Sequence, residues 1–299
     1  MFAKIIVGID GADGGRDALA LARTLAGETA RLVLVTSFPH DEVVNRGTLP
    51  GYERLLREDV VKALLESAGD DDRCHIHAVA DSSPGRALHE EAEREDADLI
   101  VVGSCHHGAV GRILLGDVSR ATLHGAPCPV AVAPHGYREH PSESIGTIGV
   151  GFNDTVESRA ALTTAAQLAE DCGATLRLLT AVTSPAAMGP ADMYGYNWSE
   201  VEAESRVLAE LTISKAAAEL TVPVDTETVA TNPGLALERL SEHVDVIVAG
   251  SRGWGATHRV VLGSTTDHIT HHSHCPVIIV PSPAHDREGL SHAVQPVLL

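Results

Sequence analysis

The sequence predicts an α/β protein made of two tandem copies of one unit, each with a doubly wound, five-stranded parallel sheet. Short β-branched apolar runs alternate with longer stretches of helical period, which is typical of crossover units and a parallel sheet. The same landmarks occur twice along the 299 residues. The fourth apolar run of each copy, LIVVG or VIVAG, is continuous, as expected of a strand buried on both faces.

The duplication is visible as matched landmarks at constant spacing. DLIVVGS ends at Ser104 and DVIVAGS at Ser251, while APCPVAVAP ends at Pro134 and SHCPVIIVP at Pro281. Both pairs are offset by 147 residues (251 − 104 and 281 − 134). The polar, proline-containing segment YREHPSESIG separates the copies, as a linker does. We therefore expect one unit over residues 1–140 and a second over residues 141–299.

Each copy has the expected element order β-α-β-α-β-α-β-α-β, with the helices between the strands. The first copy has strands at about Lys4–Gly8, Leu32–Ser37, His75–Ala80, Leu99–Gly103 and Pro129–Ala133. The second has them at about Thr147–Gly151, Thr175–Val182, Asp225–Ala230, Val244–Gly250 and Pro276–Val280. In such a sheet, ligands bind at the carboxyl ends of the central strands.

Charge and composition exclude several classes of partner. The formal charge of −19 repels a polyanion, and the 3% aromatic content offers few stacking platforms for bases, so no nucleic-acid partner is expected. The five cysteines form no C-x-x-C pair, which fits a reducing compartment. No secretory signal and no apolar run of about 18 residues is found. We expect a cytoplasmic protein that does not enter a membrane and that binds a small molecule.

The segment after the fourth strand of the second copy contains the candidate ligand-binding residues. It reads Gly250-Ser-Arg-Gly253, then nine residues, then Gly263-Ser264-Thr265-Thr266, or G-x2-G-x9-G-[ST]. Glycines past a strand let backbone N–H groups approach an anion. A helix N-terminus adds unpaired donors, hydroxyls and a favourable dipole. This pattern predicts a polyphosphate cradle, against the simpler alternative of an ordinary helix cap after a glycine turn.

With VGID at the start and CPV before the last strand, this arrangement resembles the universal stress protein family, in its tandem two-domain form. The resemblance implies an adenine nucleotide alpha-hydrolase-like fold with strand order 3-2-1-4-5. It also implies ATP as the ligand, with or without magnesium. Phosphates and ribose are implied to lie at Ala249, Gly250, Arg252, Gly253, Gly263, Ser264, Thr265 and Thr266. Base and sugar are implied to lie near Gly151, Asn153 and Ala181, where Asn153 replaces the family's usual aspartate.

The first copy is an eroded version of the same motif. Its corresponding site residues are Gly8, Asp10, Ser37, Gly103, Gly116 and Ser119. His106 stands where the second glycine of the motif belongs, and Asp117 replaces the serine or threonine that follows Gly116. A carboxylate at a helix N-terminus caps the donors that a phosphate would use and repels it. We therefore expect weaker nucleotide binding, or none, in this copy.

Three functions remain open at this stage. The leading interpretation is a nucleotide-binding regulator of a stress or dormancy response, in which ATP occupancy of the second copy sets conformation or the binding of an unidentified protein partner. No general base is evident, so no catalytic residue is assigned. The rival is a weak ATPase or nucleotide hydrolase, with Asp10 or Asp154 helping a magnesium ion. The third is a scaffold without a ligand.

Two further features are weighed. The segment HITHHSHC brings His268, His271 and His272 near one helical face, and Cys105-His106-His107 is a similar cluster. Zinc or nickel would suit such ligands. Solvated histidines explain them more simply, so no metal residue is assigned. Finally, the resemblance implies that the copies pair through their last strands, CPVAVAP and CPVIIVP, and that the chain forms a homodimer.

Overall fold

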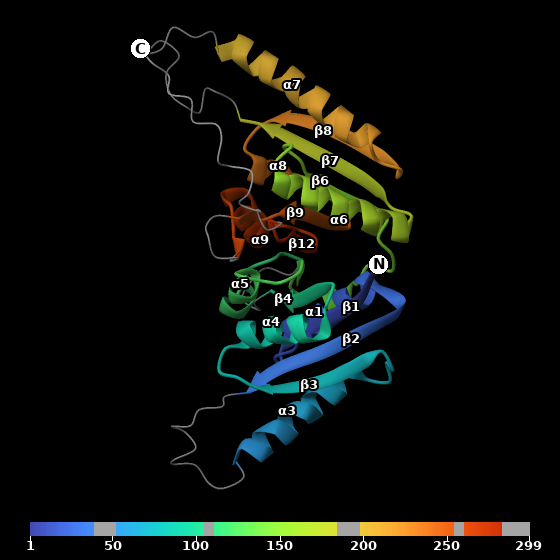
Figure 1. Ribbon diagram of the computed structural model, residues 1–299, viewed down its shortest axis with the longest axis vertical. Coiled ribbons are helices and arrows are strands. Elements are labelled where there is room, and N and C mark those ends of the chain that lie inside the picture. The colour runs from blue at the N-terminus through green and yellow to red at the C-terminus, as the bar shows by residue number, and fades with distance from the viewer. Residues whose placement is uncertain (39–51, 105–110, 184–197, 254–259, 283–299) are drawn as a thin grey trace, which may run out of the picture.

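The computed structural model describes residues 1–38, 52–104, 111–183, 198–253 and 260–282. Ten strands form one continuous sheet that runs the length of the molecule, in the order β3-β2-β1-β4-β5-β12-β9-β6-β7-β8 (Figure 1). Counted within each copy, the strands lie in the order 3-2-1-4-5, and the second copy repeats that order in reverse across the sheet. The α/β class predicted from the sequence is confirmed, with the two predicted sheets joined into one.

The first copy holds five strands and four described helices. They are β1 Phe2–Gly8, α1 Asp13–Leu25, β2 Ala26–Phe38, α3 Tyr52–Ala68, β3 Cys74–Ala80, α4 Pro84–Glu95, β4 Leu99–Gly103, α5 Asp117–Leu123 and β5 Val130–Ala133. A short 3-10 helix, η1 Tyr137–Glu139, follows in the segment between the copies. The predicted boundary at 140/141 lies just after η1.

The second copy repeats the pattern and adds a hairpin. Its elements are β6 Thr147–Gly151, α6 Val156–Cys172, β7 Thr175–Val182, α7 Trp198–Ala218, β8 Val224–Ala230, α8 Pro233–Leu240, β9 Val246–Gly250, β10 Arg252–Gly253, β11 Val260–Val261, α9 Ser264–His272 and β12 Val277–Val280. Strands β10 and β11 pair antiparallel, a feature that the sequence did not suggest. Strand β2 also begins six residues before the predicted Leu32, directly after α1.

Local sequence explains where several helices begin and end. Thr155 caps α6 by accepting a hydrogen bond from the amide of Ser158, and Gly173 ends that helix in the left-handed region. Asn232 caps α8 by accepting from the amide of Gly234 at 2.9 Å. Proline at the first position of α4 and α8 supplies a backbone angle that suits helix initiation.

The two copies meet at their last strands. β5 and β12 pair antiparallel, with Ile278 opposite Ala131, while all other neighbours in the large sheet are parallel. The main-chain amide of Ile113 also donates to the carbonyl oxygen of Ser273 across the junction, at 3.2 Å. The predicted pairing through CPVAVAP and CPVIIVP is confirmed, and each strand covers what would otherwise be an apolar edge of the other copy.

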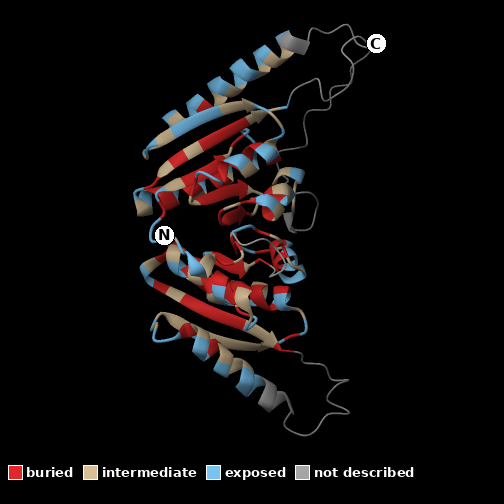
Figure 2. Ribbon diagram, turned by 180° about the vertical axis from the view of Figure 1, so that it is seen from behind, coloured by how far each residue is buried: buried red, intermediate tan, exposed pale blue. Residues whose placement is uncertain are grey.

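The core has two layers, one on each face of the sheet (Figure 2). The layer packed under α1, α3, α6 and α7 includes Ile5, Leu34 and Ile148, all fully buried. The layer under α4, α5, α8 and α9 includes Ile6 and Ile247. Alternate residues of each central strand enter opposite layers, which explains the continuous apolar runs in the sequence.

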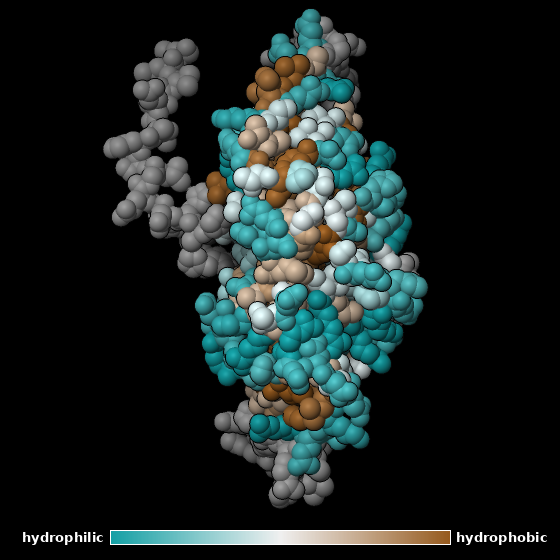
Figure 3. Space-filling model, turned by 90° about the vertical axis from the view of Figure 1, so that its right-hand side faces the viewer, coloured by the Kyte–Doolittle hydropathy of each residue, from teal (hydrophilic) through white to brown (hydrophobic). Residues whose placement is uncertain are grey.

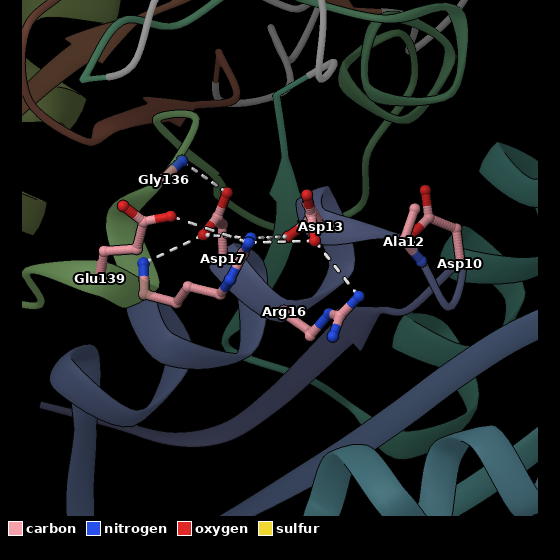
Figure 4. Close-up of polar contacts among 8 residues, drawn as sticks. Asp10, Ala12, Asp13, Arg16, Asp17, Gly136 and Glu139 are labelled. Carbon is pink, nitrogen blue, oxygen red and sulfur yellow. Dashed lines mark hydrogen bonds and ion pairs between the residues drawn. The ribbon is translucent and has the colours of Figure 1, made fainter.

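The segment between the copies is fastened to α1 (Figure 4). The carboxylate of Asp17, which is 0% exposed, accepts hydrogen bonds from the main-chain amides of Gly136 (2.8 Å) and Arg138 (3.0 Å). The Arg138 guanidinium lies 3.3 Å from Asp17 and 3.0 Å from Asp13. Because a buried carboxylate needs such partners, the linker is held in one path against the first copy.

Apolar side chains are exposed on the outermost helix of the second copy. They are Val207, Leu208 and Leu211 of α7, each more than half exposed. Figure 3 shows hydrophobic surface at the end of the molecule where α7 lies, and separate hydrophobic patches nearer the middle and at the opposite end of the same face. Within the described residues, no helix combines the length and the apolar character needed to span a membrane.

Candidate functional site

In the first copy, the predicted site residues converge on one cavity of about 420 Å³. The cavity opens at the carboxyl ends of β1, β2 and β4 and at the start of α5. Its lining includes every first-copy site residue predicted from the sequence: Gly8, Asp10, Ser37, Gly103, Gly116 and Ser119. The position is the one expected for a ligand of a doubly wound sheet.

The glycine at the end of β4 serves helix packing as well as the cavity. A Cβ atom on Gly103 would lie 2.0 Å from the main-chain oxygen of Gly14 in α1, a distance that no side chain tolerates. In the second copy, a Cβ on Gly250 would lie 2.4 Å from the main-chain oxygen of Glu157 in α6. Both glycines therefore let the helix after the first strand cross close to the fourth strand.

The start of the last helix is tied to the end of the fourth strand in both copies. The hydroxyl of Ser119 donates to the carbonyl oxygen of Gly103 at 2.7 Å, and that of Thr266 donates to Gly250 at 3.0 Å. Both side chains are 5% exposed. Their hydroxyl protons are used within the protein, so these two predicted site residues position the helix start.

The helix starts themselves have no side-chain cap. Gly116 precedes α5 and Gly263 precedes α9, and neither offers a side-chain acceptor to the first turn. A helix leaves its first amides without an intrahelical acceptor, so these donors are available to an anion. In α9 they are accompanied by the exposed side chain of Ser264 and the partly buried one of Thr265.

The two copies differ at this helix start. In the first copy, Asp117 and Val118 stand where the second has Ser264 and Thr265, and both line the cavity. The carboxylate of Asp117 is exposed, and no hydrogen bond joins it to an α5 amide in the described part of the chain. The capping by Asp117 that the sequence predicted is therefore not formed. Its negative charge nevertheless faces the cavity, where it would oppose a phosphate.

The first strands of the two copies also end differently. The carboxylate of Asp10 accepts from the amide of Ala12 at 2.9 Å and is otherwise exposed (Figure 4). Asn153 uses its side-chain oxygen to accept from the Thr155 hydroxyl at 3.0 Å. Asn153 therefore helps to build the turn into α6, and its amide nitrogen has no recorded partner among the described residues.

The remaining second-copy residues take the places that the repeat predicts. Gly151 ends β6, Ala181 lies near the end of β7, and Ala249 is buried in β9. Arg252 and Gly253 form β10, which pairs with Val261 and Val260. The segment 254–259 between these short strands lies outside the described residues, as does the Cys105-His106-His107 cluster of the first copy.

Several cavity residues were not expected from the sequence. The apolar walls are formed by Val35, Val60, Leu88 and Val102, which come from four different elements. The hydroxyl oxygens of Ser104 and of its counterpart Ser251 are buried and have no hydrogen-bond partner in the described chain. Their identical place in both copies was visible in the repeated Gly-Ser landmark, but their burial was not.

The three histidines of α9 make contacts with several different groups. His268 lies 2.7 Å from a carboxylate oxygen of Glu238, and His271 lies 2.7 Å from the main-chain oxygen of Asp267. His271 also contacts Arg120 of the other copy at 3.2 Å. The ring centroids of His268 and His272 lie 4.5 Å apart, with the ring planes tilted by 35°. In this arrangement His268 links α9 to α8, His271 links α9 to α5, and His272 packs on His268.

Comparison with known proteins agrees with the two-copy architecture of the structure. The sequence profile described as the universal stress protein family matches residues 1–134 and again 144–281. A universal stress protein of Mycobacterium tuberculosis is 28% identical over 228 residues, 76% of each chain. One from Methanocaldococcus jannaschii is 28% identical over 139 residues, 44% of this chain and 82% of its own.

Solved structures show the same fold over nearly the whole chain. The crystal structure of a universal stress protein from Archaeoglobus fulgidus superimposes with a TM-score of 0.59 at 17% identity, covering 94% of this chain and 98% of that one. A protein described as a putative universal stress protein from Pseudomonas aeruginosa gives 0.61 at 18% identity, with 93% of each chain covered.

Proposed function

The chain belongs to the universal stress protein family, and from that premise we propose that it is an ATP-binding regulatory protein whose second copy is the main nucleotide site. The observation that supports this most is the convergence of six predicted residues on one cavity in the first copy. The second copy repeats the same strand ends and helix start, with hydroxyl groups in place of the carboxylate.

We expect the two copies to differ in nucleotide affinity because their helix starts differ in charge. ATP carries several negative charges, so a helix start with Ser264 and Thr265 receives its phosphates better than one with Asp117. The hydroxyls of Ser264 and Thr265 have no recorded partner among the described residues and remain available as donors. Those of Ser119 and Thr266 are already bound to main-chain carbonyls.

The repeated unit also offers apolar side chains for packing against an adenine base. Apolar side chains of Val35, Val60 and Leu88 wall the first-copy cavity opposite the polar strand ends. A pocket with apolar walls and a few converging polar groups is typical of small-molecule sites. In the second copy, Leu237 takes the place of Leu88, since both pack on the glycine that ends the first strand, Gly151 or Gly8.

Regulation is favoured over catalysis. Asp10 and Asp154 were the candidates for holding a catalytic magnesium ion. Asp154 is paired with Arg159, and Asp10 builds the turn before α1. Tight binding of substrate and transition state alike does not accelerate a reaction. We propose that occupancy changes how the chain meets a protein partner, and that it acts in the cytoplasm as a homodimer.

Isothermal titration of the full-length chain with ATP tests this proposal through two reciprocal variants. Ser264→Asp places the first copy's carboxylate in the second, and we expect at least a tenfold loss of affinity at the main site. Asp117→Ser places the hydroxyl in the first copy, and we expect a second binding equivalent to appear or to strengthen. Unchanged binding in both variants would refute the assignment. Phosphate release that Ser264→Asp abolishes would favour the rival ATPase.

A further inference from the structure

A compact cluster of metal-ligating side chains lies away from the strand-end cavity, between β3 and α4 of the first copy. It consists of His77 on β3 and of Glu91 and Glu95 on α4, with one ligand atom of each residue within 4.8 Å of the others. The two glutamates are four residues apart, so they lie on one face of the helix. One imidazole and two carboxylates at this spacing are a ligand set for a divalent transition metal.

These side chains are largely withdrawn from solvent. The side chains of Glu91 and Glu95 are 12% and 14% exposed, and that of His77 is 23% exposed. Two carboxylates side by side at this depth repel each other and lose hydration. Positive charge is therefore needed beside them, and two arginines supply it in this structure. Arg94 contacts both carboxylates from the surface, and Arg31 lies 3.3 Å from Glu95.

Arg94 holds these three side chains together from the solvent side. The Nδ1 atom of His77 lies 2.9 Å from a carboxylate oxygen of Glu91 and 2.7 Å from a guanidinium nitrogen of Arg94. If Nδ1 carries a proton, it donates to Glu91 but opposes the Arg94 donor. If it carries none, Nδ1 and the Glu91 oxygen both accept from the same Arg94 nitrogen, which has two hydrogens to donate. A metal ion would accept both lone pairs at once, and the Arg94 side chain, already 56% exposed, has room to move into solvent.

The described part of the second copy lacks the cluster. With α4 and α8 aligned at their shared Pro-Gly start, Leu240 stands at the position of Glu91, and it is 5% exposed in the apolar core. Helix α8 ends at Leu240, so the helical turn that carries Arg94 and Glu95 has no counterpart. Glu227 occupies the place of His77 in the edge strand. The ligand set is thus particular to the first copy and is no general feature of the unit.

We propose that His77, Glu91 and Glu95 bind one zinc ion per chain, which takes over the contacts that Arg94 makes with these side chains. Three protein ligands leave a fourth position for water in tetrahedral geometry. The ion would link edge strand β3 to α4. This site is independent of the nucleotide-binding proposal, since none of its ligands lines the strand-end cavity.

The test is isothermal titration of zinc chloride into the full-length chain, stripped of metal with a chelator. The chain has 17 histidines, so other zinc-binding events are expected and the comparison of variants decides. His77→Gln should remove one binding equivalent or weaken it by roughly tenfold or more. His75→Gln is the matched control, because His75 is on the same strand and face, is exposed, and is outside the cluster.

The Arg94→Ala variant provides a second test, whose outcome differs between a zinc site and a purely structural ion-pair network. Removing the competing guanidinium should tighten zinc binding, and adding His77→Gln to that variant should cancel the gain. Cobalt(II), used in place of zinc, should give visible absorption bands that are stronger in the parent than in His77→Gln. Equal zinc binding by the parent and by His77→Gln, with both folded by circular dichroism, would overturn the proposal.

Discussion

Thr266 donates its side-chain hydroxyl to the carbonyl oxygen of Gly250, at 3.0 Å, and thereby fastens the start of α9 to the end of β9. Ser119 and Gly103 repeat this bond at the same place in the first copy, at 2.7 Å. The contact is present in the first copy too, where the G-x2-G-x9-G-[ST] motif is incomplete. The bond is therefore a structural feature of the repeated unit and does not depend on a ligand.

Thr266→Val is expected to destabilise the chain by about 1 kcal/mol, because the partly buried carbonyl oxygen of Gly250 loses its donor while the side-chain volume is kept. Thr266→Ser keeps the hydroxyl and should cost less. Urea unfolding followed by circular dichroism measures the difference. Equal stability of the valine and serine variants would show that the hydroxyl bond contributes nothing.

Gly250→Ala is expected to destabilise the chain by about 2 kcal/mol or more, since the added Cβ would lie 2.4 Å from the main-chain oxygen of Glu157 and force α6 away from β9. Gly27→Ala is the matched control, because the nearest atoms to its Cβ are at 3.8 Å. Thermal unfolding of both variants checks this. A Gly250→Ala protein as stable as the control would contradict the close-approach argument.

Asp17→Ala is expected to cost about 2 to 4 kcal/mol, because the amides of Gly136 and Arg138 lose a buried acceptor and the Arg138 guanidinium loses a partner. Asp13→Ala, which removes a carboxylate that is 42% exposed, should cost less than about 1 kcal/mol. Limited proteolysis around residues 136–142 should be faster in Asp17→Ala alone. Equal cleavage of the two variants would argue against a fastened linker.

Alkaline pH is expected to weaken the fold through two thiols. Burial raises the pKa of Cys128 and of Cys275 to about 12, from an ordinary value of 9.0. Between pH 9 and 12 the unfolded chain releases these protons and the folded chain keeps them, so stability is full below pH 9 and falls as pH rises through this range. Urea unfolding at pH 8 and pH 10.5 measures the fall. Cys275→Ala should show a shallower pH dependence than the parent, and an identical one would refute the assignment.

Sequence analysis located most of the scaffold because the pattern is written twice. Three predicted strands, Leu99–Gly103, Thr147–Gly151 and Thr175–Val182, agree with the structure at both ends. Four more, those observed as β3, β5, β8 and β12, agree within one residue. The hairpin of β10 and β11 was missed, since two-residue strands have no hydropathy pattern. The prediction that Asp117 caps its own helix was wrong, because the position of a residue at a helix start does not fix where its carboxylate points.

What the sequence determined by itself is the repeat, the alternation of elements and the composition of the two glycine-containing loops after the fourth strands, because these depend on local order along the chain. Only the tertiary structure decided which chemical groups meet. It brought Asp17 to the linker, used the hydroxyls of Ser119 and Thr266 on main-chain carbonyls, and placed His77 beside Glu91 and Glu95. Such contacts depend on how helices cross the sheet, and that crossing is set by packing across the whole core.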